Sequence, residues 1–171
     1  PIGGQETILV VEDNEGVRLT VVEVLEQSGY TVLTADDGDQ AMQKLQTGLQ
    51  PELIFTDVVM PGSLKSPEVA RKARERLPNL AVLFTSGYTE NSIVHGGRLD
   101  EGVELLTKPY TREALARKLR HVLATQTQRN EKAAAASEMP SSNADASHED
   151  ASATIQRPSI LVCEDDWMIR I

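Results

Sequence analysis

The chain has 171 residues, a length that suits one domain of ordinary size with some sequence to spare. Its apolar fraction of 40% can build a core, and an aromatic fraction of only 4% makes an aliphatic core the expectation. The formal net charge of −9 argues against direct binding of nucleic acid, which usually needs a basic face.

Cysteine content and hydropathy limit the cellular compartments that are expected for this chain. The single cysteine, Cys163, excludes an internal disulfide. No apolar run approaches the roughly 18 residues of a membrane span. The first residues, 1–7, lack the basic and apolar regions of a signal peptide. These features predict a cytoplasmic protein without membrane contact.

Short apolar runs alternate with amphipathic stretches from residue 8 onward. The first run is rich in β-branched residues and lacks polar alternation, which is typical of a strand buried on both faces. Strands are predicted over residues 8–11, 31–35, 53–56, 81–85 and 103–106. Helices are predicted over residues 15–28, 40–49, 67–77 and 112–123, with a weak helix over 91–99 that Gly96 and Gly97 interrupt. Because parallel strands are joined by right-handed crossovers, we expect an α/β fold in which helices cover both faces of a five-stranded parallel sheet.

The composition changes after Leu123, where this first domain, residues 1–123, is expected to end. Residues 124–158 are dominated by Ala, Ser, Gln, Asn and acidic residues, with almost no large apolar side chains. Such a segment cannot bury a core, so a flexible linker is predicted. Whether the last helix continues through the alanines at 133–136 is left open.

A partial repeat follows the linker. Residues 160–170 have the sequence ILVCEDDWMIR, which repeats the layout of residues 8–18, ILVVEDNEGVR. One apolar strand could recur by chance, but the acidic pair behind it and the arginine beyond it recur in register. We interpret residues 159–171 as the start of a second copy of the same domain.

Complementary polar residues follow four of the five predicted strands. Glu12 and Asp13 follow the first strand, Asp57 the third, Ser86 the fourth and Lys108 the fifth. The carboxyl ends of parallel strands meet at one edge of a sheet, where ligands bind. Three carboxylates together call for a cation, and Mg²⁺ prefers oxygen ligands. A lysine and a hydroxyl opposite them could hold the oxygens of a transferred phosphoryl group.

Each of these residues has an ordinary structural explanation when taken alone. The acidic pair could cap a helix, Asp57 could be a turn residue, Ser86 could start a loop, and Lys108 could be solvated. Together these explanations require four independent coincidences at four strand ends. The sequence therefore favours a phosphoryl-transfer site.

An acidic pair, an Asp, a Ser and a Lys-Pro at these separations resemble the receiver domains of bacterial two-component response regulators. The resemblance implies a doubly wound sheet with the strand order 2-1-3-4-5. It also implies that Asp57 is the phosphoacceptor. Mg²⁺ would be bound by Asp13, Asp57 and the backbone carbonyl of Val59, with Glu12 assisting, and would be the only cofactor.

The resemblance extends to the other side of the site. Ser86 would hydrogen-bond the phosphoryl group, Lys108 would pair with it, and the peptide bond before Pro109 would be cis. Residues 83–88, LFTSGY, and 105–110, LLTKPY, look like receivers attached to hybrid sensor histidine kinases. The implied partner is a histidine kinase or a histidine phosphotransfer domain, and a homodimer is left open. Such a fragment is an enzyme only in that it catalyses its own phosphorylation and dephosphorylation.

Two other functions stay in view. A docking module, or pseudo-receiver, would keep the fold without being phosphorylated. A phosphatase of the haloacid dehalogenase type would also form an aspartyl phosphate, but it needs a second Asp two residues later, where this chain has Val59.

Some positions depart from the family pattern. Leu105 occupies the position of an aromatic switch residue, and Tyr88 or Tyr110 could take that role, although half-exposed packing is the expectation for both. His95, a candidate relay histidine, is interpreted as a surface residue because its segment is not a stable helix.

Overall fold

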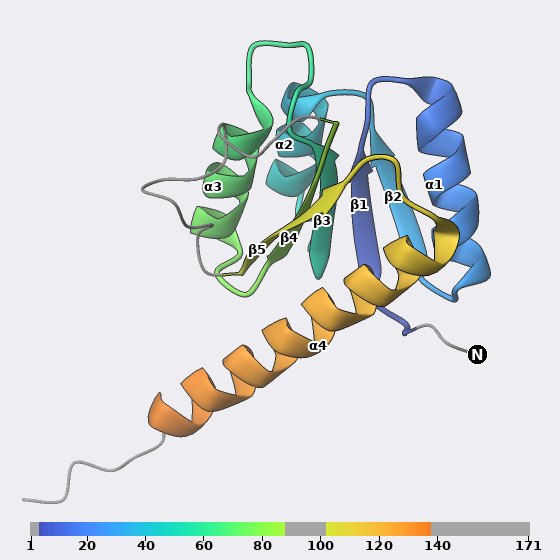
Figure 1. Ribbon diagram of the computed structural model, residues 1–171. Helices are drawn as coiled ribbons and strands as arrows, with labels where there is room; N and C mark the ends of the chain where they lie inside the picture. The colour runs from blue at the N-terminus through green and yellow to red at the C-terminus, as the bar shows by residue number, and fades with distance from the viewer. Residues whose placement is uncertain (1–3, 88–101, 138–171) are drawn as a thin grey trace, which may run out of the picture. The chain divides into compact units, whose positions relative to one another are not determined.

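Five parallel strands form one sheet in the order β2-β1-β3-β4-β5 (Figure 1). The computed structural model describes residues 4–87 and 102–137. The strands are β1 (Thr7–Val11), β2 (Thr31–Ala35), β3 (Leu53–Asp57), β4 (Ala81–Ser86) and β5 (Val103–Thr107). The helices are α1 (Glu15–Gln27), α2 (Gly38–Gln46), α3 (Ser66–Arg76) and α4 (Arg112–Ser137). The predicted doubly wound α/β fold and its strand order are confirmed.

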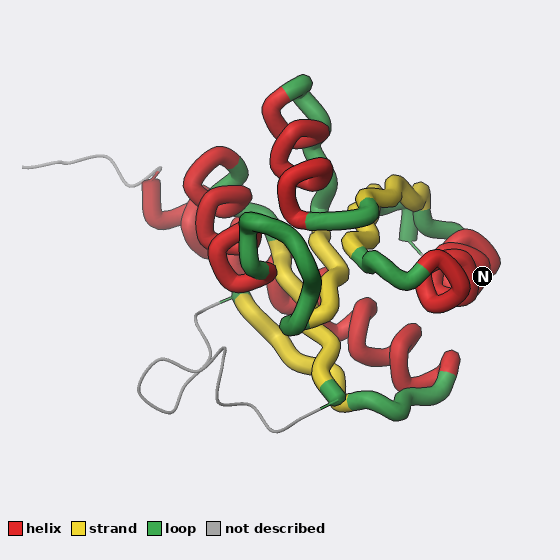
Figure 2. Tube along the Cα trace, turned by 90° about the horizontal axis from the view of Figure 1, so that it is seen from above, coloured by secondary structure: helices red, strands yellow, loops and turns green. Residues whose placement is uncertain are grey.

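Alternate side chains of the central strands enter two different layers of the core. Val10 and Phe55 pack with apolar residues of α1 and α4, among them Leu25 and Leu119. Their neighbours in sequence, such as Ile54, pack on the other face with residues of α2 and α3. Figure 2 shows helices on both sides of the sheet. This two-sided burial explains why the sequence of β1 and β3 is apolar without alternation.

Most element boundaries agree with the pattern, and the differences have local causes. Asn14 caps α1 by accepting a hydrogen bond from the backbone N–H of Val17 at 3.1 Å. Gly29, with φ of +92°, ends the same helix as predicted. Helix α2 ends at Gln46, earlier than the predicted residue 49, because the chain turns at Gly48 with φ of +99°.

The last helix is longer than predicted. Helix α4 continues to Ser137 instead of ending at Leu123, so the first part of the predicted linker, residues 124–137, is helical. Its alanines and long polar side chains are strong helix formers. Gln126 is also buried on the domain and donates a hydrogen bond to Asn130 at 3.0 Å, one turn along.

Several predictions fall outside the described residues. They concern the weak helix over 91–99 with His95, the side chain of Tyr88, the remaining linker over 138–158, and the partial repeat over 159–171. Within the described ranges, none of the four helices combines the length and the apolar character that a membrane crossing requires.

Candidate functional site

The strand register brings the polar strand ends to one edge of the sheet. In the middle of the sheet, β3 lies between β1 and β4, and Asp57 pairs in register with Thr85. Ser86 is therefore one residue farther along the neighbouring strand, and it pairs in register with Thr107 of β5. Residues from four distant parts of the sequence thus lie at the carboxyl edge of β1, β3, β4 and β5.

Asp57 and Lys108 form an ion pair at the centre of this edge. Lys108 Nζ contacts Asp57 Oδ2, and the two side chains are 30% and 18% exposed. The other carboxylate oxygen, Oδ1, accepts a hydrogen bond from the backbone N–H of Val59 at 3.0 Å. The loop after β5 is held in place as well, since the backbone N–H of Lys108 donates to the Ser86 carbonyl at 2.8 Å. The Lys108–Pro109 peptide bond is cis, as the resemblance implied.

Glu12 is the buried member of the carboxylate group. Its side chain is 4% exposed, and its Oε1 accepts a hydrogen bond from the backbone N–H of Asn14 at 3.1 Å. Burial raises the pKa of Glu12, and the negative charges of Asp57 and Asp13 add to the rise. The Asn14 hydrogen bond and the positive charge of Lys108 lower it and offset part of the effect. The carboxylates are therefore close enough to repel one another.

The raised pKa of Glu12 gives a stability prediction for the metal-free protein. Because the folded state raises the pKa of Glu12 above the ordinary value of 4.5, it binds a proton more tightly than the unfolded chain does. The free energy of unfolding therefore falls progressively as the pH rises from 4.5 through the pKa of Glu12 in the folded protein. Glu12→Gln is expected to remove this loss and to raise the unfolding free energy at neutral pH by on the order of 1 kcal/mol.

Urea unfolding with a chelator present, at acidic and at neutral pH, measures the effect of Glu12→Gln. Glu75→Gln on the exposed face of α3 is the control and is expected to leave the pH dependence as it is. A Glu12→Gln variant that is less stable than the parent at neutral pH would contradict the assignment of Glu12 as a strained carboxylate.

The donor atoms at this edge suit a hard divalent cation. Asp13 is exposed beside Glu12, and Val59 follows Asp57 with its side chain 73% exposed. Across the described part of the chain, no three His, Cys, Asp or Glu side chains lie close enough to hold a metal ion by themselves. Mg²⁺ commonly uses only one or two protein carboxylates and completes its shell with water and phosphate oxygens. The carboxylates and backbone carbonyl present therefore fit Mg²⁺, and the described residues at this edge include no histidine or cysteine ligand.

Two residues near the site were not assigned to it from the sequence. Arg18 donates a hydrogen bond from Nη1 to the Glu12 carbonyl at 2.6 Å. Tyr110 packs against the core under α1 and α4, which agrees with the packing role predicted for it. Burial raises the pKa of its hydroxyl to about 12, and the charges of Glu12 and Asp57 add to the rise, so this ring lies near the carboxylates. The only sequence signal for Arg18 was the recurrence of an arginine in the partial repeat.

The position of the family's aromatic switch residue carries an aliphatic side chain. Leu105 is partly buried against Val58 and Phe84, so an apolar side chain fills the place of the aromatic ring.

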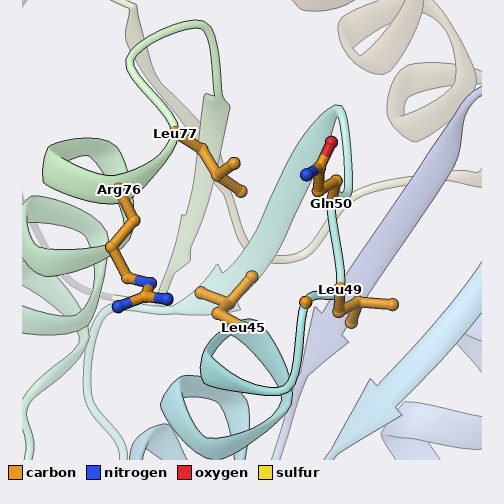
Figure 3. Close-up of a pocket in the computed structure, with 6 residues that line it drawn as sticks. Leu45, Leu49, Gln50, Arg76 and Leu77 are labelled. Carbon is orange, nitrogen blue, oxygen red and sulfur yellow. The ribbon is translucent and has the colours of Figure 1, made fainter.

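A shallow hollow of about 310 Å³ lies between the ends of α2 and α3, near the amino end of β3 and away from the carboxylates (Figure 3). None of the proposed site residues lines this hollow. Its lining residues are Leu45, Gly48, Leu49, Gln50, Arg76 and Leu77.

Comparisons with curated proteins identify relatives in two kinds of chain. Over 126 residues the chain is 32% identical to the sensor kinase CckA of Brucella abortus, and the match covers 73% of this chain but 13% of the kinase. It is also 32% identical over 117 residues to the response regulator receiver protein CpdR of the same organism, covering 68% of this chain and 95% of that protein.

Solved structures agree with these relatives. The crystal structure of the receiver domain from the hybrid histidine kinase CckA is 34% identical, with a TM-score of 0.57 over 68% of this chain and 98% of that one. The chemotaxis protein CheY4 of Vibrio cholerae is 27% identical, with a TM-score of 0.62 over 70% and 99%. The family described as the response regulator receiver domain matches residues 8–120. The chain therefore belongs to the response regulator receiver domains of two-component signal transduction.

Proposed function

We propose that Asp57 accepts a phosphoryl group from a phosphohistidine. A carboxylate oxygen of Asp57 bonds to phosphorus as the phosphorus–nitrogen bond of the donor breaks, and the released imidazole takes up a proton from water. The observation that carries the proposal is the ion pair of Asp57 with Lys108 beside the buried Glu12. An unmodified site that already holds opposed charges is suited to a transfer in which charge moves between fixed groups.

Each neighbouring group has a role in this proposal. Val59 fixes the carboxylate through its backbone N–H, which leaves the orientation of the acceptor defined before the donor arrives. The ammonium of Lys108 neutralises charge on the phosphoryl oxygens, and the hydroxyl of Ser86 hydrogen-bonds one of them. Mg²⁺, held by Asp13, Asp57 and the Val59 carbonyl with Glu12 assisting, would supply further charge neutralisation.

The proposed donor is a histidine kinase or a histidine phosphotransfer domain. The described residues leave three large apolar side chains exposed, Val17, Leu19 and Val59. Val17 and Leu19 lie on α1, which begins soon after Asp13, and Val59 lies two residues after Asp57. Val59, close to the acceptor, is therefore available for contact with a donor protein, whereas Val17 and Leu19 lie roughly 200° apart around α1 and do not form one patch. The acidic chain is not proposed to bind nucleic acid or a membrane, and a homodimer is a secondary hypothesis.

We also propose that this domain is part of a hybrid histidine kinase and lies in the cytoplasm. The relation to the sensor kinase CckA supports it, although the match covers 13% of that kinase. The partial repeat supports it as well, because residues 159–171 would begin a second receiver domain after a linker that starts beyond α4.

The two rival functions are less well supported. A phosphatase of the haloacid dehalogenase type would need an acid at residue 59, and an exposed valine cannot donate a proton. A docking module without phosphorylation has no need for an aspartate–lysine pair at the strand ends.

Incubation of the whole chain with Mg²⁺ and acetyl phosphate tests the proposal. We expect the intact mass to increase by one phosphoryl group, and we expect hydroxylamine, which cleaves acyl phosphates, to reverse the gain. A chelator should prevent it. No gain with Mg²⁺ present would favour the docking module, and continuous hydrolysis of a phosphoester would favour the phosphatase.

A further inference from the structure

We propose that the segment joining β2 to α2, residues 36–39, positions the two loops that carry the proposed metal ligands. This segment, called the turn below, includes the first two residues of α2. The inference rests on the proposed function, since it concerns the same site. None of these four residues is a proposed ligand. Two contacts to neighbouring loops and one close backbone approach connect the turn to the site.

The first contact reaches the acidic pair through Arg18. One guanidinium nitrogen, Nη2, lies 3.1 Å from Asp36 Oδ1, and the other, Nη1, donates to the Glu12 carbonyl at 2.6 Å. The Arg18 side chain is only 15% exposed, so the guanidinium is enclosed between its two partners. Because the Glu12 carbonyl belongs to the peptide unit that leads into Asp13, this fork fixes the backbone from which both carboxylates project.

The second contact reaches the loop between β3 and α3, which carries Val59. The Ser63 hydroxyl donates to the Asp39 carboxylate, with Oγ 2.8 Å from Oδ1 and 2.7 Å from Oδ2. The loop also packs directly on the turn at Gly38. A Cβ at that position would lie 2.9 Å from the Leu64 carbonyl oxygen and 2.6 Å from a methyl group of Val69. The turn and the loop are therefore in close backbone contact.

The turn itself is fixed by a reciprocal helix cap. The Asp37 carboxylate accepts a hydrogen bond from the backbone N–H of Gln40 at 2.7 Å, and the Gln40 side chain accepts one from the backbone N–H of Asp36 at 3.0 Å. Helix α2 in turn packs on the sheet through Met42 and Leu45. Both ligand-bearing loops are thus attached to one rigid support.

These contacts are expected to act on metal affinity more than on stability. The Asp36 side chain is 60% exposed, and ion pairs with an exposed partner contribute little to folding free energy. By contrast, groups that orient metal ligands commonly change affinity by roughly 10- to 100-fold when they are lost. The partial repeat keeps the same arrangement in sequence, since Arg170 follows Glu164 and Asp165 as Arg18 follows Glu12 and Asp13.

Titration of the unphosphorylated whole chain with Mg²⁺ alone, followed by heteronuclear NMR, tests the inference. Arg18→Met is expected to weaken Mg²⁺ binding by roughly tenfold, the low end of the usual effect of such supporting groups. Asp36→Asn and Ser63→Ala, which each remove one exposed contact, should weaken it less and in the same direction. Arg71→Met is the matched control, because it removes an arginine from an exposed ion pair on α3 and should leave binding unchanged.

A second measurement separates positioning from a structural role. With acetyl phosphate and saturating Mg²⁺, Arg18→Met should be phosphorylated at nearly the rate of the parent. Arg18→Lys, which keeps a positive charge, should reach that rate at a lower Mg²⁺ concentration than Arg18→Met. Parent-like Mg²⁺ binding by Arg18→Met, or by Asp36→Asn and Ser63→Ala if Arg18→Met does not fold, would overturn the inference. A rate that stays low at saturating Mg²⁺ would overturn it too. A parent chain that binds no Mg²⁺ would instead overturn the proposed function beneath it.

Discussion

The Asp57→Asn variant is expected to take up no phosphoryl group from acetyl phosphate under conditions in which the parent chain becomes modified. An amide oxygen is far less nucleophilic than a carboxylate oxygen, and the amide cannot form a stable acyl phosphate. The substitution keeps the size of the side chain, and its oxygen can still accept the hydrogen bond from the Val59 N–H. The fold should therefore persist, with a change in unfolding free energy of about 1 kcal/mol or less.

Intact mass and urea unfolding of the same sample measure both parts of this expectation. Glu68→Gln is a matched control, since it removes a carboxylate that pairs with Lys72 at 3.0 Å on the exposed face of α3. The control should be modified as the parent is. If Asp57→Asn gains a phosphoryl group as readily as the parent, the acceptor lies elsewhere, and the site residues proposed around Asp57 lose their basis.

The sheet could be predicted from the sequence because its signal is local. The apolar runs of β1 and β3 are buried on both faces, and an acidic residue, Glu12 or Asp57, marks the carboxyl end of each. The covalent order of strands and helices then leaves few topologies, and the resemblance selected one of them. The grouping of Asp57 with Lys108 followed from the rule that parallel strands end at a common edge.

The remaining features depend on contacts between distant segments or lack a periodic apolar pattern. The extension of α4 beyond Leu123 contains no apolar stripe, and its buried residue, Gln126, is polar. The contact of Arg18 with Asp36 needs the register of β1 against β2, which no local pattern specifies. The burial of Glu12 is likewise a property of the assembled edge, since an acidic residue after a strand is ordinarily exposed.

Replacement of Lys108 by methionine is expected to affect phosphorylation and Mg²⁺ binding in opposite directions. Methionine keeps much of the apolar stem of lysine but removes the ammonium that contacts Asp57. Loss of one positioned group that stabilises the developing charge commonly costs roughly 10²- to 10³-fold in rate, and we expect a decrease of that size with acetyl phosphate at saturating Mg²⁺. Mass spectrometry over time gives the rate, and Lys72→Met is the matched control for loss of an exposed, paired lysine.

Binding of Mg²⁺ to the unmodified Lys108→Met chain should be at least as tight as binding to the parent. The ammonium repels an incoming cation and occupies an oxygen of Asp57, and its positive charge also lowers the pKa of Glu12. Without it the carboxylates repel one another more strongly, so a divalent cation relieves more repulsion when it binds. A variant that loses both properties together would instead indicate a collapsed site. A slower phosphorylation together with undiminished Mg²⁺ affinity is expected only if Lys108 acts on the transferred phosphoryl group and does not support the metal site.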